Sequence, residues 1–140
     1  MTVDELLDKW FAKARKDLHS AHLCLEPEDN ELESVCFFCQ QTAEKALKAY
    51  LISHNIEPIR THDTEYLCQE CMKFDPTFES HIAICRVLKK YAIEIRYPDP
   101  MIEIDESTAR QTLEYAQAVY NFCYEKTHPN ETKNNHAPTP

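Results

Sequence analysis

The chain contains no glycine in 140 residues, and this absence restricts the backbone more than any motif does. Glycine is the residue that adopts positive φ most readily, and phosphate-cradling loops need it where the backbone approaches the ligand. The sequence therefore excludes a P-loop and a dinucleotide-binding fingerprint. Primed hairpin turns also depend on glycine. What remains favoured is a set of long helices whose connections use Pro, Asn and Asp.

Apolar residues recur three or four positions apart along most of the chain, the spacing of amphipathic helices. The pattern predicts helices over residues 3–25, 31–54, 63–74 and 105–127, and one that begins at Asp75-Pro76, passes Ile95 and ends before Pro98. This is an all-α prediction: an up-and-down four-helix bundle with one extra short helix. Residues 1–127 form a single domain in this interpretation. The polar, Pro-rich residues 128–140 are expected to form a disordered tail.

Polar residues at the predicted helix ends support these boundaries. Thr2 and Glu5 have the spacing of a capping box. Asp29 or Asn30 is expected to cap the second helix, and Asp105 the last one. Asn55 follows the second helix and is expected to take the left-handed conformation that glycine usually adopts there.

The formal net charge is −9, from 24 acidic and 15 basic side chains. A field of this sign repels polyanions, which argues against DNA as a partner but leaves room for a local basic patch that holds one nucleotide. The chain has no apolar run of about 18 residues, so no membrane span is expected. Its charged N-terminus does not resemble a signal peptide. With seven cysteines expected to be reduced thiols, the prediction is a cytoplasmic protein.

Two Cys-x-x-Cys pairs, Cys36/Cys39 and Cys68/Cys71, raise the question of a metal site. Structural zinc needs four convergent ligands, and such pairs usually stand on tight turns. Here both pairs fall inside helical pattern, so the favoured interpretation is core packing, with zinc or thiol redox chemistry as alternatives. No metal and no cofactor is predicted.

Two histidines one turn apart, His19 and His22, also raise the question of a metal site. They are expected to lie on a solvated flank of the first helix, because a two-histidine metal site needs a further ligand from another helix. Arg15 precedes them by one turn.

Three segments carry a family resemblance in their order and spacing. They are the run from Cys36 to Leu51, the triplet Thr61-His62-Asp63, and Tyr91 followed by Arg96-Tyr97-Pro98. Together they resemble the HEPN family (higher eukaryotes and prokaryotes nucleotide-binding domain) from about residue 10 to about residue 120. The resemblance implies a helical bundle, a homodimer, and a minimal nucleotidyltransferase as partner in a toxin–antitoxin-like or nucleotide-transfer module.

Nuclease members of this family carry an Arg followed, after four to six residues, by a His. Histidine can move the 2′-hydroxyl proton of RNA and arginine can stabilise charge on the phosphate. The natural counterpart of that Arg is Arg96, but Met101, Ile102 and Glu103 stand where the His belongs. Arg15 and His22 have the spacing on the wrong helix. The resemblance therefore implies binding rather than cleavage.

A nucleotide or RNA phosphate site remains, predicted at Lys45, Thr61, His62, Arg96 and Tyr97. A guanidinium can hold phosphate bidentately, a phenol can stack on a base, and the N–H groups at the start of the short helix attract anions. Each residue also has a structural interpretation. His62 can brace its loop, Arg96 can pair with a nearby glutamate, and Lys45 can be a solvated side chain.

Two other functions stay open at this point. One is a metal-independent endoribonuclease with His62 as general base and Arg96 on the phosphate. The other is a structural dimerisation module without a ligand. Large apolar residues in excess of one narrow core stripe suggest a protein–protein face and hence a homodimer; they are Trp10, Phe11, Phe37, Phe38 and Tyr50.

Overall fold

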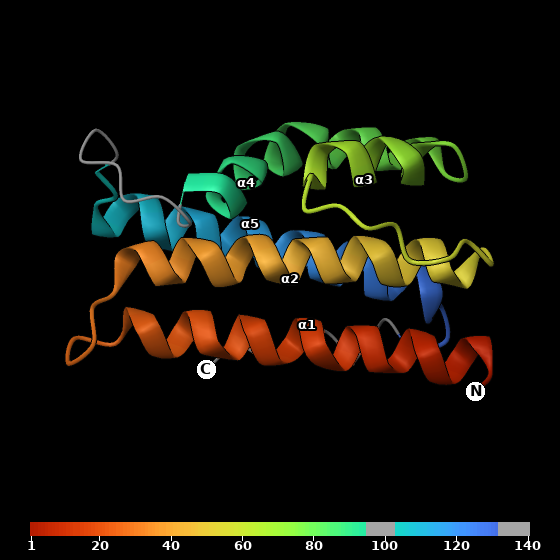
Figure 1. The fold of residues 1–140 in the computed structure, drawn as a ribbon, viewed down its shortest axis with the longest axis horizontal. Helices are drawn as coiled ribbons and strands as arrows, with labels where there is room; N and C mark the ends of the chain where they lie inside the picture. Colours follow the sequence, from red (N-terminus) through yellow and green to blue (C-terminus); the bar gives the residue numbers. More distant parts are fainter. Residues whose placement is uncertain (95–102, 132–140) are drawn as a thin grey trace.

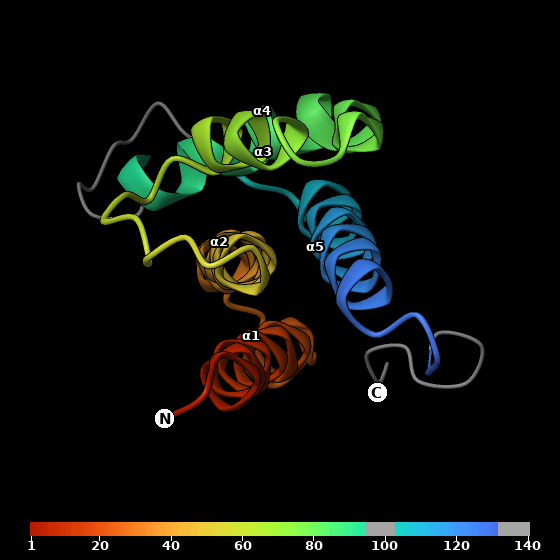
Figure 2. The ribbon, with the colours of Figure 1, turned by 90° about the vertical axis from the view of Figure 1, so that its right-hand side faces the viewer.

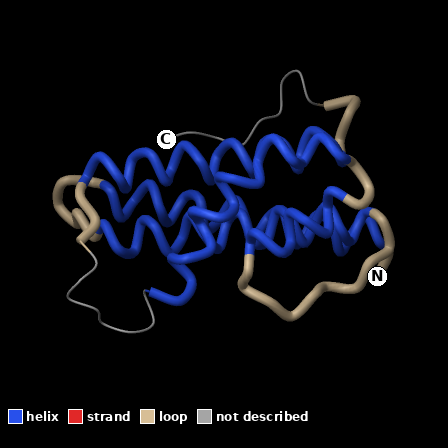
Figure 3. The backbone as a smooth tube through the Cα atoms, turned by 90° about the horizontal axis from the view of Figure 1, so that it is seen from above, coloured by secondary structure: helices blue, strands red, loops and turns tan. Residues whose placement is uncertain are grey.

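The computed structural model describes residues 1–94 and 103–131 of the chain. Within these residues the backbone is helical and contains no strand (Figure 3), which confirms the all-α prediction. The elements are α1 (Val3–Leu25), α2 (Leu32–Ser53), α3 (Thr64–Met72), the 3-10 helix η1 (Pro76–His81), α4 (Ile82–Glu94) and α5 (Glu106–Thr127). None of the helices in the described part of the chain combines the length and the apolar character needed to cross a bilayer.

The central element of the bundle is α2, which contacts α1, α3, α4 and α5. Figure 2 shows α1 on one side of α2, α5 beside it, and the α3–α4 pair on the side opposite α1. Packing on several sides explains why α2 is buried almost all round, with polar residues among its buried positions. A helix in this position has to satisfy its polar side chains inside the protein.

Side-chain caps set most of the helix starts where the sequence predicts them. The capping box of Thr2 and Glu5 is present at the start of α1. Asp63, Asp75 and Asp105 each accept a hydrogen bond from a backbone N–H of the helix that follows. These caps satisfy donors that have no partner within the helix.

The predicted cap of the second helix is wrong. Residue Glu31 stands at the N-cap of α2 and makes no capping hydrogen bond. Asn30 has φ 42° and its N–H donates to the Glu26 carbonyl at 2.7 Å, so it reverses the chain after α1 instead. Asn55 has φ 63° after α2, as predicted. Asparagine thus supplies both left-handed residues of the described chain.

The segment after Asp75 differs from the single helix that the pattern predicts. Its first turn is the 3-10 helix η1, and α4 begins only at Ile82. Asp75 accepts from both the N–H (3.0 Å) and the hydroxyl (2.6 Å) of Thr77, which tightens this first turn. The predicted continuation of α4 through Ile95 lies outside the described residues.

Two of the five aromatics that suggested an interface belong to the core. Phe11 and Tyr50 are buried at 1% and 4% exposure. Trp10 and Phe38 are partly buried against that core, and Phe37 meets Phe38 edge to face. Phe11 and Tyr50 therefore serve core packing and are not available to a protein partner.

The cysteines behave as small apolar residues. All seven are free thiols, and six of them are buried. Burial raises the pKa of Cys39 and Cys71 above the usual range for a thiol. In residues 1–94 and 103–131, no three His, Cys, Asp or Glu side chains come together as a metal site.

The end of the described chain extends the bundle slightly past α5. His128, which the sequence pattern placed in the tail, stacks on Tyr124 with ring centroids 4.0 Å apart. Its Nε2 lies 3.6 Å from a carboxylate oxygen of Asp8 on α1. The remaining predicted tail, residues 132–140, lies outside the described residues.

Candidate functional site

The loop of residues 54–63 brings the second sequence motif against the first. Figure 1 shows this loop leaving the C-terminal end of α2 and returning alongside the helix before α3 begins. At its end, the carbonyl of His62 accepts a hydrogen bond from the Gln40 amide at 2.8 Å. The family motif on α2 and the Thr-His-Asp triplet are therefore neighbours in space.

A buried carboxylate joins these two segments. Oε1 of Glu44 lies 2.9 Å from Nδ1 of His62 and accepts from the Gln40 amide at 3.1 Å. Its other oxygen, Oε2, accepts from the Lys48 ammonium at 3.0 Å. Both oxygens of Glu44 thus have donors, as a carboxylate removed from water requires.

The charges of this cluster are largely removed from solvent. Glu44 and Lys48 are 4% and 6% exposed, and the Lys48 ammonium lies 5.7 Å from the ring centroid of Trp10 on α1. An ion pair shielded by an indole face interacts more strongly than one in water. We call Gln40, Glu44, Lys48 and His62 the Glu44 cluster.

His62 is the member of the Glu44 cluster that reaches solvent, with 51% of its side chain exposed. Because an ionised carboxylate only accepts hydrogen bonds, Nδ1 of His62 carries the proton of that bond. No described residue makes a hydrogen bond to Nε2. In the neutral tautomer this nitrogen offers a lone pair at the surface, held in direction by a buried acid.

The start of α3 is less open to an anion than the sequence suggested. The Asp63 carboxylate accepts from the N–H of Tyr66 at 3.0 Å, and the Thr61 hydroxyl accepts from the N–H of Asp63 at 3.1 Å. The Lys89 ammonium of α4 lies 3.3 Å from Asp63 and 3.5 Å from Glu65. A phosphate at this helix end has to share the site with a protein carboxylate.

Lys45 is directed away from the Glu44 cluster. Its ammonium forms an ion pair with Asp17 of α1, and both side chains are about four-fifths buried, at 20% and 17% exposure. The structure therefore brings Thr61 and His62 together and places Lys45 with α1. The other two predicted site residues, Arg96 and Tyr97, lie outside the described residues, as does their distance from His62.

Two members of the cluster, Gln40 and Glu44, were missed from the sequence. Gln40, Glu44 and Lys48 are spaced four apart on a helix that is otherwise mostly apolar. This spacing places polar groups on one side of α2. It is the signal that identifies a buried polar row once α2 is known to be the central helix.

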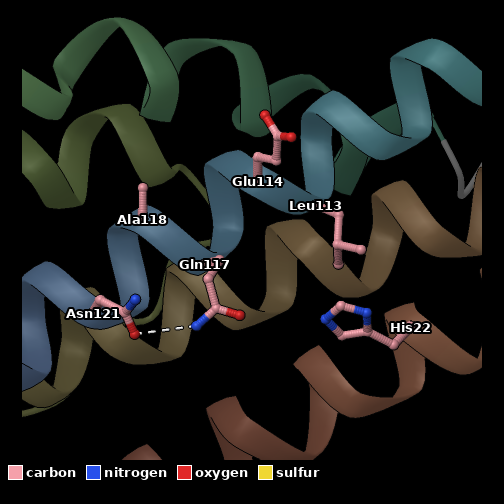
Figure 4. A pocket seen from close by; sticks show the side chains of 6 residues that line it. All are labelled: His22, Leu113, Glu114, Gln117, Ala118 and Asn121. Atoms are coloured by element: carbon pink, nitrogen blue, oxygen red, sulfur yellow. Dashed lines mark hydrogen bonds between the residues drawn. The ribbon is translucent and has the colours of Figure 1, made fainter. Parts of the chain in front are cut away.

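A separate cavity of about 340 Å³ lies between α1 and α5. Figure 4 shows the His22 ring of α1 directed toward Leu113 and Gln117 of α5, with the Gln117 amide donating to Asn121 at 3.1 Å. Nε2 of His22 is buried and has no hydrogen-bond partner among the described residues. Burial, and the nearby His19, lower the pKa of His22, so this imidazole is neutral. His22 is thus packed against α5, while His19 is exposed as predicted.

Comparisons with known proteins agree with the sequence motifs. The family model for the HEPN domain matches residues 7–127. A solved structure, described as the crystal structure of an archaeal HEPN homologue, is 26% identical, with a TM-score of 0.69 over 86% of this chain and 97% of its own. No curated protein matches the chain.

Proposed function

Because the chain belongs to the HEPN domain family, we propose that it binds a nucleotide or an RNA phosphate at the surface around His62 without cleaving it. The observation that supports this is the half-exposed imidazole whose Nδ1 is held 2.9 Å from the buried Glu44 carboxylate. An imidazole oriented from behind presents one fixed nitrogen to a ligand. Thr61 lies beside it in the chain.

The rest of the proposed site comes from residues that the sequence nominates. Arg96 supplies the phosphate contact and Tyr97 the stacking surface. Lys45 is directed away from His62 and pairs with Asp17, so in this proposal it adds positive charge only at long range. Absence of a His at residues 101–103 favours binding over cleavage.

The proposed setting is a cytoplasmic homodimer that works with a minimal nucleotidyltransferase in a toxin–antitoxin-like module. Support for it is the family membership. Light scattering at micromolar concentration tests the dimer, and a monomer there contradicts it. Affinity purification from the native lysate with identification by mass spectrometry tests the partner. Recovery of a stoichiometric small nucleotidyltransferase is the expected result, and recovery of the chain alone argues against the module.

Binding is tested by fluorescence anisotropy with labelled AMP and a labelled single-stranded RNA, without added metal. We expect His62→Ala and Arg96→Ala each to weaken binding at least about tenfold, the loss of one charge-assisted contact. His19→Ala and Arg110→Ala are the matched controls, since both residues are exposed, His19 on α1 and Arg110 on α5. Equal affinity of His62→Ala and the unmodified protein overturns the site.

A second candidate function is a metal-independent endoribonuclease. The contact between His62 and Glu44, called the dyad below, favours it. A carboxylate that orients an imidazole with its lone pair outward is the arrangement of a general base. Electrophoresis of the same RNA in the presence of EDTA separates the two functions. Intact RNA after prolonged incubation supports binding alone, whereas cleavage that disappears in both His62→Ala and Arg96→Ala establishes the enzyme.

A further inference from the structure

A second cavity, with a more polar lining, lies between α1 and the C-terminal end of α5. Its volume is about 370 Å³ and its lining residues are Asp8, Phe11, Arg15, Tyr124, His128 and Glu131. Arg15 contacts α5, whereas Trp10 and Asp17 contact α2. The cavity therefore lies on the opposite flank of α1 from the Glu44 cluster, and it is independent of the function proposed at His62.

Arg15 is the unusual group in this cavity. Its Nη1 donates a hydrogen bond of 2.7 Å to the hydroxyl of Tyr120, which is 1% exposed. Burial raises the pKa of Tyr120, so the phenol is neutral. No carboxylate of residues 1–94 or 103–131 lies within 4.0 Å of the guanidinium. Arg15 is thus a half-buried cation fixed in position by a neutral partner.

The two carboxylates that line the cavity are engaged elsewhere. Asp8 lies 3.6 Å from Nε2 of His128 and is 71% exposed. Glu131 accepts from the Tyr124 hydroxyl at 3.0 Å. Within residues 1–94 and 103–131, Arg15 forms no ion pair with either of them. A planar guanidinium with unused donors at a cavity wall matches the geometry of a carboxylate or a phosphate.

The remaining walls are aromatic rings. Phe11 meets Tyr124 and His128 edge to face, with centroids 5.3 Å and 5.7 Å away. The rings of Tyr124 and His128 lie nearly parallel, at 6°. The partly exposed rings of Tyr124 and His128 therefore lie next to one cation, and an orienting polar group beside aromatic side chains is a combination found in small-molecule sites.

We propose that this cavity binds a small aromatic anion, with its carboxylate or phosphate group on Arg15 and its ring against Tyr124 and His128, which Phe11 supports from the core. A volume of about 370 Å³ is more than a bare inorganic anion fills. The ring contacts select for an aromatic body, and the guanidinium selects for the negative charge. Tyr120 is a positioning residue that holds the guanidinium toward the cavity.

The test uses the full chain and four probes: benzoate, phenyl phosphate, the neutral benzyl alcohol and inorganic phosphate. Binding is followed by two-dimensional NMR of backbone amides and the arginine Nε–H groups. We expect benzoate and phenyl phosphate to shift the Arg15 and Tyr124 signals in a saturable manner. Benzyl alcohol and inorganic phosphate should bind at least tenfold more weakly. The relative response to benzoate and phenyl phosphate identifies which oxyanion the site prefers.

Variants then assign the effect to Arg15. Arg15→Gln should lose at least tenfold in affinity, and Tyr120→Phe should lose several-fold while it retains the cation. Lys13→Gln, an exposed change on the same helix, is the matched control and should bind normally. If Arg15→Gln is unstable, Arg15→Lys keeps the charge but removes the two parallel N–H donors of the guanidinium.

Unchanged binding in Arg15→Gln or Arg15→Lys overturns the proposal. Equal binding of benzoate and benzyl alcohol, or of phenyl phosphate and inorganic phosphate, also overturns it. His62 does not line this cavity, so we expect His62→Ala to bind benzoate and phenyl phosphate normally. Failure of the nucleotide site at His62 is therefore distinguishable from failure of the Arg15 cavity.

Discussion

Nδ1 of His62 lies 2.9 Å from Oε1 of Glu44, although 18 positions separate the two residues in the chain. The contact ties the end of the 54–63 loop to the central helix. It also connects a surface group to a buried ion pair, because the other oxygen of Glu44 accepts from Lys48 at 3.0 Å. Changes at the surface and in the interior are therefore coupled through one carboxylate.

The Glu44–Lys48 pair should be costly to break from one side. Glu44→Gln leaves the Lys48 ammonium buried without a counterion and should lower the free energy of unfolding by about 3 kcal/mol. In the double variant Glu44→Gln/Lys48→Met no unpaired charge remains, so we expect at least half of that loss to be recovered. Urea unfolding of the three proteins measures both effects. A double variant no more stable than Glu44→Gln would show that the unpaired Lys48 charge is not the cause of the loss.

The tautomer of His62 provides a direct check of the dyad. A neutral histidine that donates from Nδ1 to a carboxylate has its lone pair on Nε2. We expect the ¹⁵N shifts of the neutral His62 ring to show protonated Nδ1 and bare Nε2. In Glu44→Leu the acceptor is absent, and this preference should disappear. An Nε2–H signal in the unmodified protein would contradict the geometry.

Stability should depend on pH through His22 and His81. Burial lowers the pKa of both imidazoles in the folded protein. The unfolded chain therefore binds protons first as the pH falls below the usual histidine pKa of about 6.5. The free energy of unfolding should decrease between pH 7 and 5.5, since it rises with pH wherever the unfolded state binds more protons. The double variant His22→Gln/His81→Gln should show a flatter profile in urea titrations, and an unaltered slope would rule out these two groups.

The Asp75 carboxylate should contribute to acid stability. The Lys126 ammonium, 2.8 Å away, and the Thr77 donors lower the pKa of Asp75 to about 2. Its contribution is present above the usual aspartate pKa and is lost as the pH falls toward 2. Asp75→Ala removes the cap and the ion pair and should lower the free energy of unfolding by about 1–2 kcal/mol at neutral pH. Asp75→Asn retains the capping oxygen, so a loss equal to that of alanine would show that the cap contributes nothing.

The positive φ angle of Asn55 can be tested by substitution. Its φ of 63° lies in the region where a Cβ atom is unfavourable. Asn55→Gly should be neutral or stabilising, whereas Asn55→Val should lower the free energy of unfolding by about 1–2 kcal/mol. Thermal melts of the two variants measure the difference. Equal stability would mean that the residue leaves this conformation in solution.

The sequence predicted the parts of the fold that depend on local chemistry. Apolar spacing located the helices, and Thr2, Asp105 and Asn55 marked ends that the structure confirms. The local signal failed where one residue is suited to two different roles. Asn30 has both a capping side chain and tolerance for positive φ, and the chain uses the second property.

The candidate site was less accessible from sequence because it depends on how a loop folds back. His62 was identified by its motif, but Glu44 carries no mark that it faces His62 across 18 positions. Contacts with four other helices place α2 at the centre of the bundle. Only this position requires the polar residues of α2 to have partners inside the protein. Lys45 shows the reverse case, since its position one residue after Glu44 directs it to Asp17 on a different helix.

Trp10, the only tryptophan of the chain, stands with its ring centroid 5.7 Å from the Lys48 ammonium. The emission of an indole depends on the electric field around it, and here the ammonium over the ring belongs to the Glu44 cluster. The contacts from His62 to Glu44, from Glu44 to Lys48 and from Lys48 to Trp10 therefore connect the protein surface with its one intrinsic indole fluorophore. If a ligand binds at the proposed surface site, we expect the tryptophan emission of the native chain to change, with no label attached.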